Sequence, residues 1–341
     1  MLLSEVTTLR LGGPARSVVE ATTEAELIDA VRAADEAAEP VLLVGGGSNL
    51  VISDEGFDGT VVLVRTRGID VSADACSGAM VTVAAGEGWD DFVAYVVEHD
   101  WEGVEALSGI PGSVGATPIQ NVGAYGQEVA DTIVSVRTWD RHEKRVRTIM
   151  FTDLGFSYRH SRFKDEPDRF VVLTVAFQLR FAGRLSAPVR YAELARRLGV
   201  EVGERAPLEE VRRTVLELRR GKGMVLDAAD HDTWSAGSFF TNPILTAEAA
   251  AALPAEAPRF EQADGTVKTS AAWLIDHAGF EKGHRRGAVG LSTKHVLALT
   301  NRGDGTATEL LDLAREVRDE VERTFGVRLV NEPVIVGAAG L

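Results

Sequence analysis

Apolar residues recur along the chain at two spacings, one typical of helices and the other of strands. Residues 22–37 and 306–325 carry apolar side chains three and four positions apart, and a threonine three residues before a glutamate begins each segment as a capping box. Further helices are expected at residues 90–99, 207–219 and 270–277. Runs of β-branched and other apolar residues predict strands at residues 41–44, 60–64, 80–84, 132–139, 170–179 and 327–336. This mixture predicts an α+β protein.

Chain length and charge limit the possible classes of protein. A chain of 341 residues exceeds the size at which single cores stop growing, and the change to shorter elements near residue 222 indicates a domain boundary. The net charge of −15 argues against a nucleic-acid surface. The chain has no long apolar stretch, and its N-terminus lacks the order of a secretory signal. We therefore expect a cytoplasmic protein with no membrane partner.

Cysteine and histidine usage gives no sign of a metal centre. The single cysteine, Cys76, excludes an internal disulfide and a multi-thiolate site, and its expected role is that of a loop thiol. The seven histidines show no metal-ligand spacing, so no metal is expected. An anionic ligand would have to be held by locally gathered arginines and lysines.

Two glycine-rich segments could hold the phosphates of a nucleotide. Three consecutive glycines at residues 45–47 follow a predicted strand, so backbone amides there can approach an anion closely. This turn matches neither a Walker motif nor a dinucleotide fingerprint. Residues 109–126 contain five glycines and are too long for a simple turn. Two such segments suit a dinucleotide better than a mononucleotide, although each can also be a purely structural turn or loop.

Two other segments concentrate polar groups. Residues 158–164 hold three cations, one imidazole and two hydroxyls, and Arg159 or Arg162 could bind a carboxylate bidentately. Ser238 lies among small and aromatic residues without the Gly-x-Ser-x-Gly pattern, so it is not read as an acyl-transfer nucleophile. Taken alone, the first cluster can equally be solvated surface charge and Ser238 a turn residue.

Seven blocks in order along the chain resemble the UDP-N-acetylenolpyruvoylglucosamine reductase family. The resemblance covers essentially the whole chain, and the second glycine segment and the Ser-Phe-Phe block are its most diagnostic parts. The stretch around Tyr191 resembles the longer subtype, which carries an extra loop over the substrate. The blocks are Thr8-Leu-Arg-Leu-Gly-Gly-Pro14, residues 45–50, residues 109–126, residues 158–164, Gly237-Ser-Phe-Phe-Thr-Asn-Pro243, Ala272-Trp-Leu-Ile275 with Glu281-Lys-Gly283, and Asn331-Glu-Pro-Val-Ile-Val-Gly337.

The resemblance implies a vanillyl-alcohol-oxidase-type (PCMH) FAD-binding fold of two α+β subdomains with a C-terminal substrate-binding domain. The implied division is residues 1–66 for the first subdomain, residues 67–221 with the C-terminal strand 327–341 for the second, and residues 222–326 for the substrate domain. The implied cofactors are FAD and NADPH. The implied substrate is UDP-N-acetylglucosamine enolpyruvate, an intermediate of peptidoglycan synthesis. We expect a monomer.

The resemblance also implies the residues of the site. Hydride addition at the methylene of the enolpyruvyl group leaves an enolate beside the carboxylate; Arg159 and Glu332 would stabilise it, and Ser238 would deliver the proton. The implied FAD-binding residues are Gly45, Gly46, Gly47, Ser48, Asn49, Leu50, Gly109, Ile110, Pro111, Gly112, Ser113, Gly115, Ala116, Gln120, Asn121, Gly123, Ala124, Tyr125 and Gly126. The implied substrate-binding residues are Tyr158, Tyr191, Lys222, Asn242, Lys282 and His295, the last standing where other members have glutamine.

Two alternatives stay open. One is a flavin oxidase of the same fold, although neither glycine segment has a nearby histidine or cysteine to tether FAD. The other is a non-catalytic nucleotide-sugar binding protein, which would give no joint role to Ser238 and Glu332.

Overall fold

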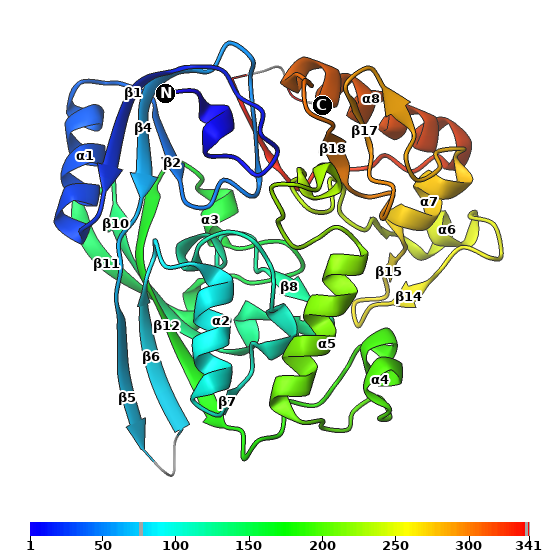
Figure 1. Cartoon of the computed structure of the whole chain (residues 1–341), viewed down its shortest axis with the longest axis horizontal. Helices are drawn as coiled ribbons and strands as arrows, with labels where there is room; N and C mark the ends of the chain where they lie inside the picture. Colours follow the sequence, from blue (N-terminus) through cyan, green and yellow to red (C-terminus); the bar gives the residue numbers. More distant parts are fainter. Residues whose placement is uncertain (75–77, 338–339, 341) are drawn as a thin grey trace. The chain divides into compact units, whose positions relative to one another are not determined.

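The computed structural model describes residues 1–74, 78–337 and 340 as two compact units (Figure 1). Unit 1 comprises Met1–Ala15, Gly47–Phe57 and Lys222–Leu341, and unit 2 comprises Arg16–Gly46 and Asp58–Gly221. The expectation for Cys76 lies outside the described residues. Within the described part of the chain, no helix has the length and apolar character needed to span a membrane.

Unit 2 is built on an antiparallel sheet whose long central strand is β12. The strands run in the order β11-β10-β12-β6-β5, and the short β7 pairs with the end of β12. Helix α2 packs on this sheet (Figure 1). The rings of Phe92 and Phe177 lie 4.9 Å apart in the core between them. The strands are β5 (Ile69–Asp74), β6 (Gly78–Ala84), β7 (Trp101–Glu102), β10 (Ile133–Asp140), β11 (Arg145–Met150) and β12 (Phe170–Phe181), and the helix is α2 (Trp89–Glu98).

A smaller sheet, the short strand pair β8 and β9, and four α-helices are further regular elements described in unit 2. The sheet has the order β1-β4-β2, and β2 and β4 are parallel. Helix α1 begins with the predicted capping box of Thr23 and Glu26. Helices α4 and α5 pack together over a second apolar core. The bounds are β1 (Ala15–Ala21), α1 (Glu24–Glu36), β2 (Val41–Val44), β4 (Phe57–Val64), β8 (Gly123–Ala124), β9 (Gln127–Glu128), α3 (Arg162–Asp165), α4 (Ala192–Leu198) and α5 (Leu208–Gly221).

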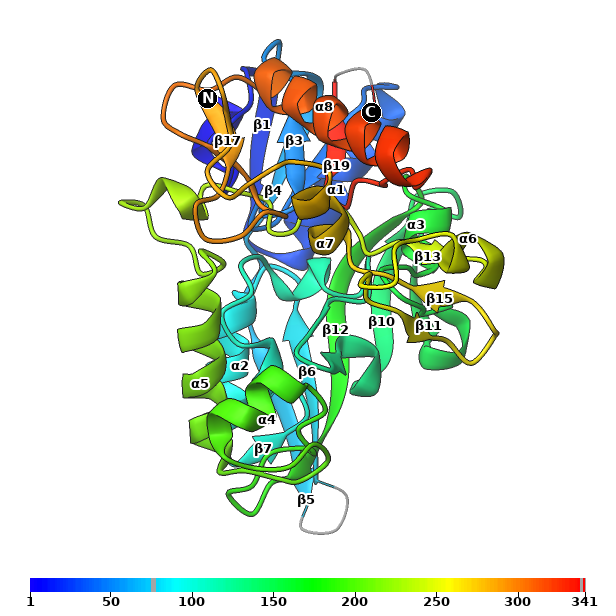
Figure 2. The same cartoon turned by 90° about the vertical axis from the view of Figure 1, so that its right-hand side faces the viewer.

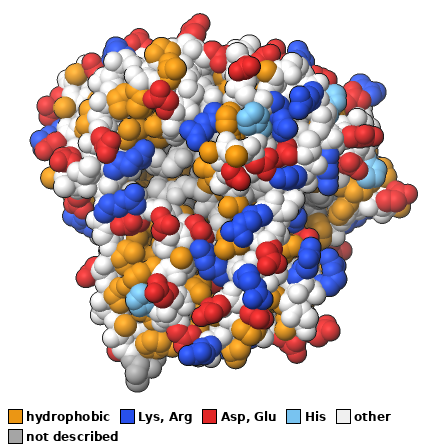
Figure 3. Space-filling view, viewed as in Figure 1, with side chains coloured by type: hydrophobic (Ala, Val, Ile, Leu, Met, Phe, Trp, Pro, Cys, Tyr) orange, Lys and Arg blue, Asp and Glu red, His pale blue; other side chains and the backbone are white. Residues whose placement is uncertain are grey.

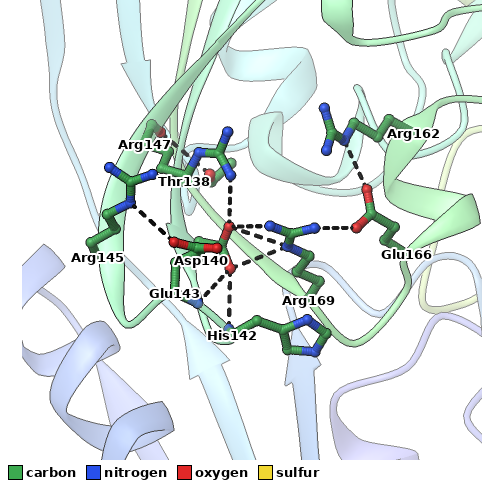
Figure 4. Close-up of polar contacts among 9 residues, drawn as sticks. All are labelled: Thr138, Asp140, His142, Glu143, Arg145, Arg147, Arg162, Glu166 and Arg169. Atoms are coloured by element: carbon green, nitrogen blue, oxygen red, sulfur yellow. Dashed lines mark hydrogen bonds and ion pairs between the residues drawn. The ribbon is translucent and has the colours of Figure 1, made fainter.

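A fully buried aspartate holds the turn between β10 and β11. Asp140 accepts hydrogen bonds of 3.1 Å from the amides of His142 and Glu143, and it also binds the guanidinium groups of Arg147 and Arg169 (Figure 4). Burial opposes ionisation, but the bonds from Arg169, the Glu143 amide and Arg147 more than offset it and hold the pKa of Asp140 well below its ordinary value. This network anchors the hairpin to the start of β12.

Unit 1 combines three small sheets with helices around an apolar core of its own. Strand β19 lies parallel to β3, and Leu9 from the N-terminal segment is buried in the same core as α8 (Figure 2). Asp54 accepts the amides of Ala307 and Thr308 at 2.7 and 3.0 Å, which secures the first turn of α8. The bounds are β3 (Leu50–Ile52), β13 (Ile244–Leu245), α6 (Ala247–Ala251), β14 (Phe260–Glu261), β15 (Val267–Lys268), α7 (Ala271–His277), β16 (Arg285–Arg286), β17 (Val289–Leu291), β18 (Leu299–Asn301), α8 (Ala307–Phe325) and β19 (Val334–Val336).

The predicted helices and internal strands are confirmed within a few residues at their ends. The predicted C-terminal strand was wrong in extent, because only Val334–Val336 is a strand. Pro333 has no amide to donate, and Asn331 forms an isolated bridge with Phe240 instead. The strand also pairs with Leu50–Ile52, whereas we expected it to join residues 67–221. The three-part domain division stays a prediction.

Charged side chains of both signs are interspersed over the face shown in Figure 3. The net charge of −15 is therefore accompanied by many local ion pairs, such as the exposed pair of Arg16 with Asp58 at 3.1 Å. Ion pairs of this exposed kind contribute little to stability individually.

Candidate functional site

The glycine turn after β2 lies directly against the second glycine segment. A Cβ added at Gly46 would lie 2.6 Å from the Cα of Gly112, and one at Gly45 would lie 2.3 Å from the Oγ of Ser113. The two backbones can approach this closely only because these positions lack side chains. No carbonyl group among the described residues accepts a hydrogen bond from the amides of Gly45, Gly46 or Gly112. These amides are thus placed to bind an anion.

A carboxylate on α2 fixes the start of the second glycine segment. Asp90 accepts the amide of Gly109 at 2.6 Å and binds both terminal nitrogens of Arg212 on α5, at 2.6 and 3.0 Å. Burial opposes ionisation of Asp90, but the bonds from Arg212 and Gly109 outweigh it and lower the pKa of Asp90. The segment therefore begins at a charged clamp that joins two helices.

A buried asparagine fixes the later part of the same segment. Asn121 is 1% exposed and has a φ of 47°, a left-handed conformation that asparagine tolerates better than most residues. Its side-chain amide donates to Glu128 at 2.7 Å and to the carbonyl of Ser157 at 3.1 Å, and its oxygen accepts the amide of Ala130. Asn121 thus ties the predicted flavin segment to the loop that precedes Arg159.

Of the two arginines proposed to bind a carboxylate, only Arg159 contacts the second glycine segment. Its terminal nitrogen donates to the carbonyl of Gly123 at 2.8 Å, and its guanidinium lies 5.2 Å from the ring centre of Tyr158. Arg162, on α3, instead forms a 2.8 Å ion pair with Glu166 (Figure 4). The charge of Arg162 is therefore paired at the end of α3, whereas Arg159 bonds to the second glycine segment.

Tyr191 lies at the end of the second glycine segment. Its ring meets that of Tyr125 edge to face, with 5.4 Å between ring centres. A Cβ at Gly126 would lie 2.8 Å from the Cβ of Arg190, so the chain around Tyr191 packs closely on the segment. Tyr191 is 42% exposed, which leaves part of its ring accessible to a ligand.

Unit 1 joins the segments that carry Ser238, Glu332 and Asn49. The amide of Glu332 donates to the carbonyl of Phe239 at 2.8 Å, and the side chain of Asn49 donates to the carbonyl of Glu332 at 3.4 Å. The amide of Phe239 donates in turn to the carbonyl of Leu297 at 2.7 Å. The segments that carry Ser238 and Glu332 are thus joined by a backbone hydrogen bond, and the side chain of Asn49 joins the end of the first glycine turn to the same point.

His295 lies in the field of two other predicted substrate residues. Burial, followed by the charges of Lys222 and Lys282, lowers the pKa of His295 to about 4. The amide of Leu297 donates to its Nδ1 at 3.0 Å, so in the neutral ring the proton is on Nε2. The three residues form a group of two cations and one uncharged donor. Asn242 is fixed separately, because its side-chain oxygen accepts the amide of Ala271 at the start of α7.

The predicted site residues are divided between the two units. Unit 2 carries Arg159, Tyr158, Tyr191 and residues 109–126, while unit 1 carries Ser238, Glu332 and the remaining substrate-binding residues. Sequence reasoning missed the supporting aspartates, Asp90 and Asp232. Asp90 lies in the first turn of a helix, where acidic residues are common, and nothing local marked it as the partner of a distant arginine.

Two family models and several known proteins match this chain in sequence. A model of the FAD binding domain matches residues 15–148, and a model of the C-terminal domain of UDP-N-acetylenolpyruvoylglucosamine reductase matches residues 229–336. The UDP-N-acetylenolpyruvoylglucosamine reductase of Streptomyces coelicolor is 58% identical over 99% of this chain and 89% of its own. That of Cutibacterium acnes is 57% identical over 98% of this chain and 89% of its own. The chain belongs to the UDP-N-acetylenolpyruvoylglucosamine reductase family.

A solved member of the reductase family has the same fold. The crystal structure of the enzyme from Thermus caldophilus has a TM-score of 0.66, is 26% identical, and matches 98% of this chain and 97% of its own. The matches confirm the expected vanillyl-alcohol-oxidase-type FAD-binding fold with a C-terminal domain. The close approach of Gly46 to Gly112 leaves backbone amides free of side-chain cover, which is the chemistry that a phosphate group of FAD requires.

Proposed function

We propose that this reductase family member reduces UDP-N-acetylglucosamine enolpyruvate to UDP-N-acetylmuramate for peptidoglycan synthesis, with NADPH as the reductant. The observation that carries the proposal is 58% identity to a reductase of that name over 99% of the chain. When bound, FAD supplies the transfer of hydride from the nicotinamide to the enolpyruvyl group.

Arg159 is proposed to bind the carboxylate of the enolpyruvyl group. Hydride addition at the methylene carbon places negative charge on the carbon next to this carboxylate, and the charge spreads onto the carboxylate oxygens as an enolate. A guanidinium interacts more strongly with the enolate than with the substrate and so lowers the barrier. The bond from Arg159 to the Gly123 carbonyl supports this role, because it fixes the guanidinium before the substrate arrives.

Ser238 is proposed to donate the proton that converts the enolate to the product, and Glu332 is proposed to act beside it. The hydrogen bond between the Glu332 amide and the Phe239 carbonyl supports a joint role. A serine hydroxyl is a weak acid, so it would relay a proton that it regains from solvent or a neighbour. Glu332 would either be protonated at this step or orient a donor.

The remaining predicted contacts are proposed to bind the nucleotide sugar. Lys222 and Lys282 carry the positive charge that a diphosphate requires, and the Nε2 of His295 adds an uncharged donor. Asn242, Tyr158 and Tyr191 complete the proposed substrate set. The proposed FAD contacts are residues 45–50 together with Gly109, Ile110, Pro111, Gly112, Ser113, Gly115, Ala116, Gln120, Asn121, Gly123, Ala124, Tyr125 and Gly126. A cytoplasmic location, a monomeric state and the absence of nucleic-acid and membrane partners also belong to this proposal.

The Ser238→Ala variant tests the assigned chemistry by separating the two half-reactions. The enzyme should still be reduced by NADPH, whereas its reoxidation by the enolpyruvyl substrate should slow by roughly 100-fold or more, as for the loss of a general acid. Rapid-mixing absorbance measurements without oxygen follow both steps. If NADPH reduction fails instead, Ser238 belongs to the nicotinamide site or to the fold.

A further inference from the structure

A buried aspartate in unit 1 lies at the base of the loop that carries His295. Asp232 is 5% exposed and accepts hydrogen bonds from the amide and the hydroxyl of Thr293, at 2.9 and 2.5 Å. Arg302 adds a 2.5 Å ion pair. Burial opposes ionisation, but the bonds from Thr293 and Arg302 more than offset it and hold the pKa of Asp232 at about 2. Asp232 therefore stays charged throughout the neutral range.

The loop of residues 292–297 is short and fixed at several points. After Thr293, the side chain of Lys294 binds Asp230 at 2.5 Å, and the amide of Lys294 donates to the Oγ of Ser292 at 3.1 Å. The amide of Leu297 then donates to the Nδ1 of His295. The position of the imidazole and the nitrogen that carries its proton both depend on this loop.

The two lysines near His295 are connected to the same aspartate through their neighbours. Each is followed by a glycine of positive φ, Gly223 at 66° and Gly283 at 80°. A Cβ at Gly223 would lie 3.0 Å from the carbonyl oxygen of Asp232, and one at Gly283 would lie 3.4 Å from the Cγ2 of Thr293. The backbone on the C-terminal side of each lysine thus packs on the Asp232–Thr293 junction.

We propose that Asp232 is a positioning residue for nucleotide-sugar binding, which holds the His295 loop and both lysine-bearing segments in the arrangement that receives a diphosphate. This inference rests on the proposed function, since it deepens the substrate assignment of Lys222, Lys282 and His295. In this proposal Asp232 acts through the loop and not by binding the substrate itself.

The charges around the group are consistent with an anion site. The carboxylate of Asp232 is neutralised by Arg302, and that of Asp230 by Lys294. Burial, followed by the charges of Lys222 and Lys282, suppresses the protonation of His295. A diphosphate would meet the two lysines and an N–H donor, while the nearby carboxylates are already engaged.

The experiment compares Asp232→Asn with the wild-type enzyme carrying FAD. Asparagine keeps the volume but loses the charge and one acceptor oxygen. The substrate concentration for half-maximal reoxidation should rise about tenfold or more, the cost of losing a hydrogen bond to a charged group. The maximal reoxidation rate and the rate of reduction by NADPH should stay within about twofold, since His295 and the two lysines are proposed to bind the diphosphate and not the reacting carbon atoms. Thr293→Val should weaken substrate binding in the same way, and Thr293→Ser, which keeps the hydroxyl, should restore it.

Asp140→Asn is the matched control, because Asp140 is also a buried aspartate bound to arginine but lies in the other unit. It should lower the unfolding temperature without changing the half-saturating concentration. Unchanged substrate binding in Asp232→Asn, or an equal loss in both half-reactions, would overturn the inference. Wild-type enzyme that the substrate never reoxidises would contradict the proposed function instead. In that case calorimetric titration with uridine diphosphate still tests the role of Asp232. If wild type and Asp232→Asn bind uridine diphosphate with equal affinity, the positioning role is overturned.

Discussion

The amide of Glu332 donates a 2.8 Å hydrogen bond to the carbonyl of Phe239, the residue that follows Ser238. This bond joins the C-terminal tail to the Ser-Phe-Phe block, although the two segments are far apart in the sequence. The side chain of Asn49 donates to the carbonyl of Glu332, so the end of the first glycine turn is fixed to the same point. The bond places the backbone of Glu332 beside the residue that follows Ser238, and the assignment of both residues to one chemical step stays a prediction.

Arg159→Ala should leave FAD bound and slow the reoxidation by the enolpyruvyl substrate by roughly 100-fold, the effect of removing one donor to a developing oxyanion. Stopped-flow absorbance measures this rate directly. Arg162→Ala is the control, because Arg162 is three residues away and paired with Glu166. Turnover that is unchanged in Arg159→Ala, or equally reduced in both variants, would remove Arg159 from the mechanism.

Asp90→Asn should weaken FAD binding by about tenfold, because it breaks the charged clamp between Gly109 and Arg212. Fluorescence of released flavin on dilution reports the dissociation constant. Asp91→Asn supplies a control at the neighbouring position, which is exposed. The account of the clamp fails if both variants retain flavin equally well.

His295→Gln should bind the nucleotide sugar nearly as well as the wild type, whereas His295→Ala should bind it several-fold more weakly. The reason is that the neutral ring offers one N–H donor, and a glutamine amide can offer the same. With a pKa of about 4, His295 should not contribute a break in the pH dependence of the Michaelis constant between about pH 6 and 8. A break in this range that disappears in His295→Gln would contradict the assignment.

The same pKa has a consequence for stability. Because the pKa of His295 is about 4 in the folded chain and ordinarily 6.5, the unfolded chain takes up the proton first as the pH falls. The contribution of His295 to the free energy of unfolding is therefore complete above about pH 6.5 and declines as the pH falls towards 4. Urea unfolding at several pH values should show that the difference in free energy of unfolding between wild type and His295→Gln narrows or reverses over this interval.

Asp140→Asn should lower the free energy of unfolding by roughly 3 kcal/mol at neutral pH, the scale for breaking a buried ion pair. The pKa of Asp140 is lowered below its ordinary value of 3.8 by folding, so its stabilisation is present above that value and is lost as the pH falls towards the folded pKa. Urea unfolding at pH 7 and near pH 3 measures both effects. A difference between variant and wild type that does not shrink at the lower pH would contradict this account of the hairpin.

Local sequence signals predicted much of the fold. The capping boxes at Thr23 and Thr306 form as expected because their partners lie only three residues away. The strand expected over residues 327–336 was too long because apolar composition alone does not show that Pro333 interrupts pairing. Contacts between distant residues left no local pattern, and Asp232 and Thr293 are 61 positions apart.

The candidate site was predicted mainly through the family resemblance, since glycines and serines alone could equally be turn residues. The structure adds the contacts that such a resemblance does not supply. It separates Arg159, which bonds to Gly123, from Arg162, which bonds to Glu166. That distinction depends on the backbone of the loop, where Arg159 takes a left-handed φ of 54° and α3 then begins.

The most direct test of the reductase assignment is a visible spectrum of the purified protein without oxygen, recorded before and after NADPH and then UDP-N-acetylglucosamine enolpyruvate. The account predicts a flavin band that bleaches with NADPH and returns only when the enolpyruvyl substrate is added, with UDP-N-acetylmuramate as the product. A band that NADPH does not bleach, or that only oxygen restores, would favour an oxidase of the same fold. A protein that remains colourless after addition of FAD would contradict the assignment altogether.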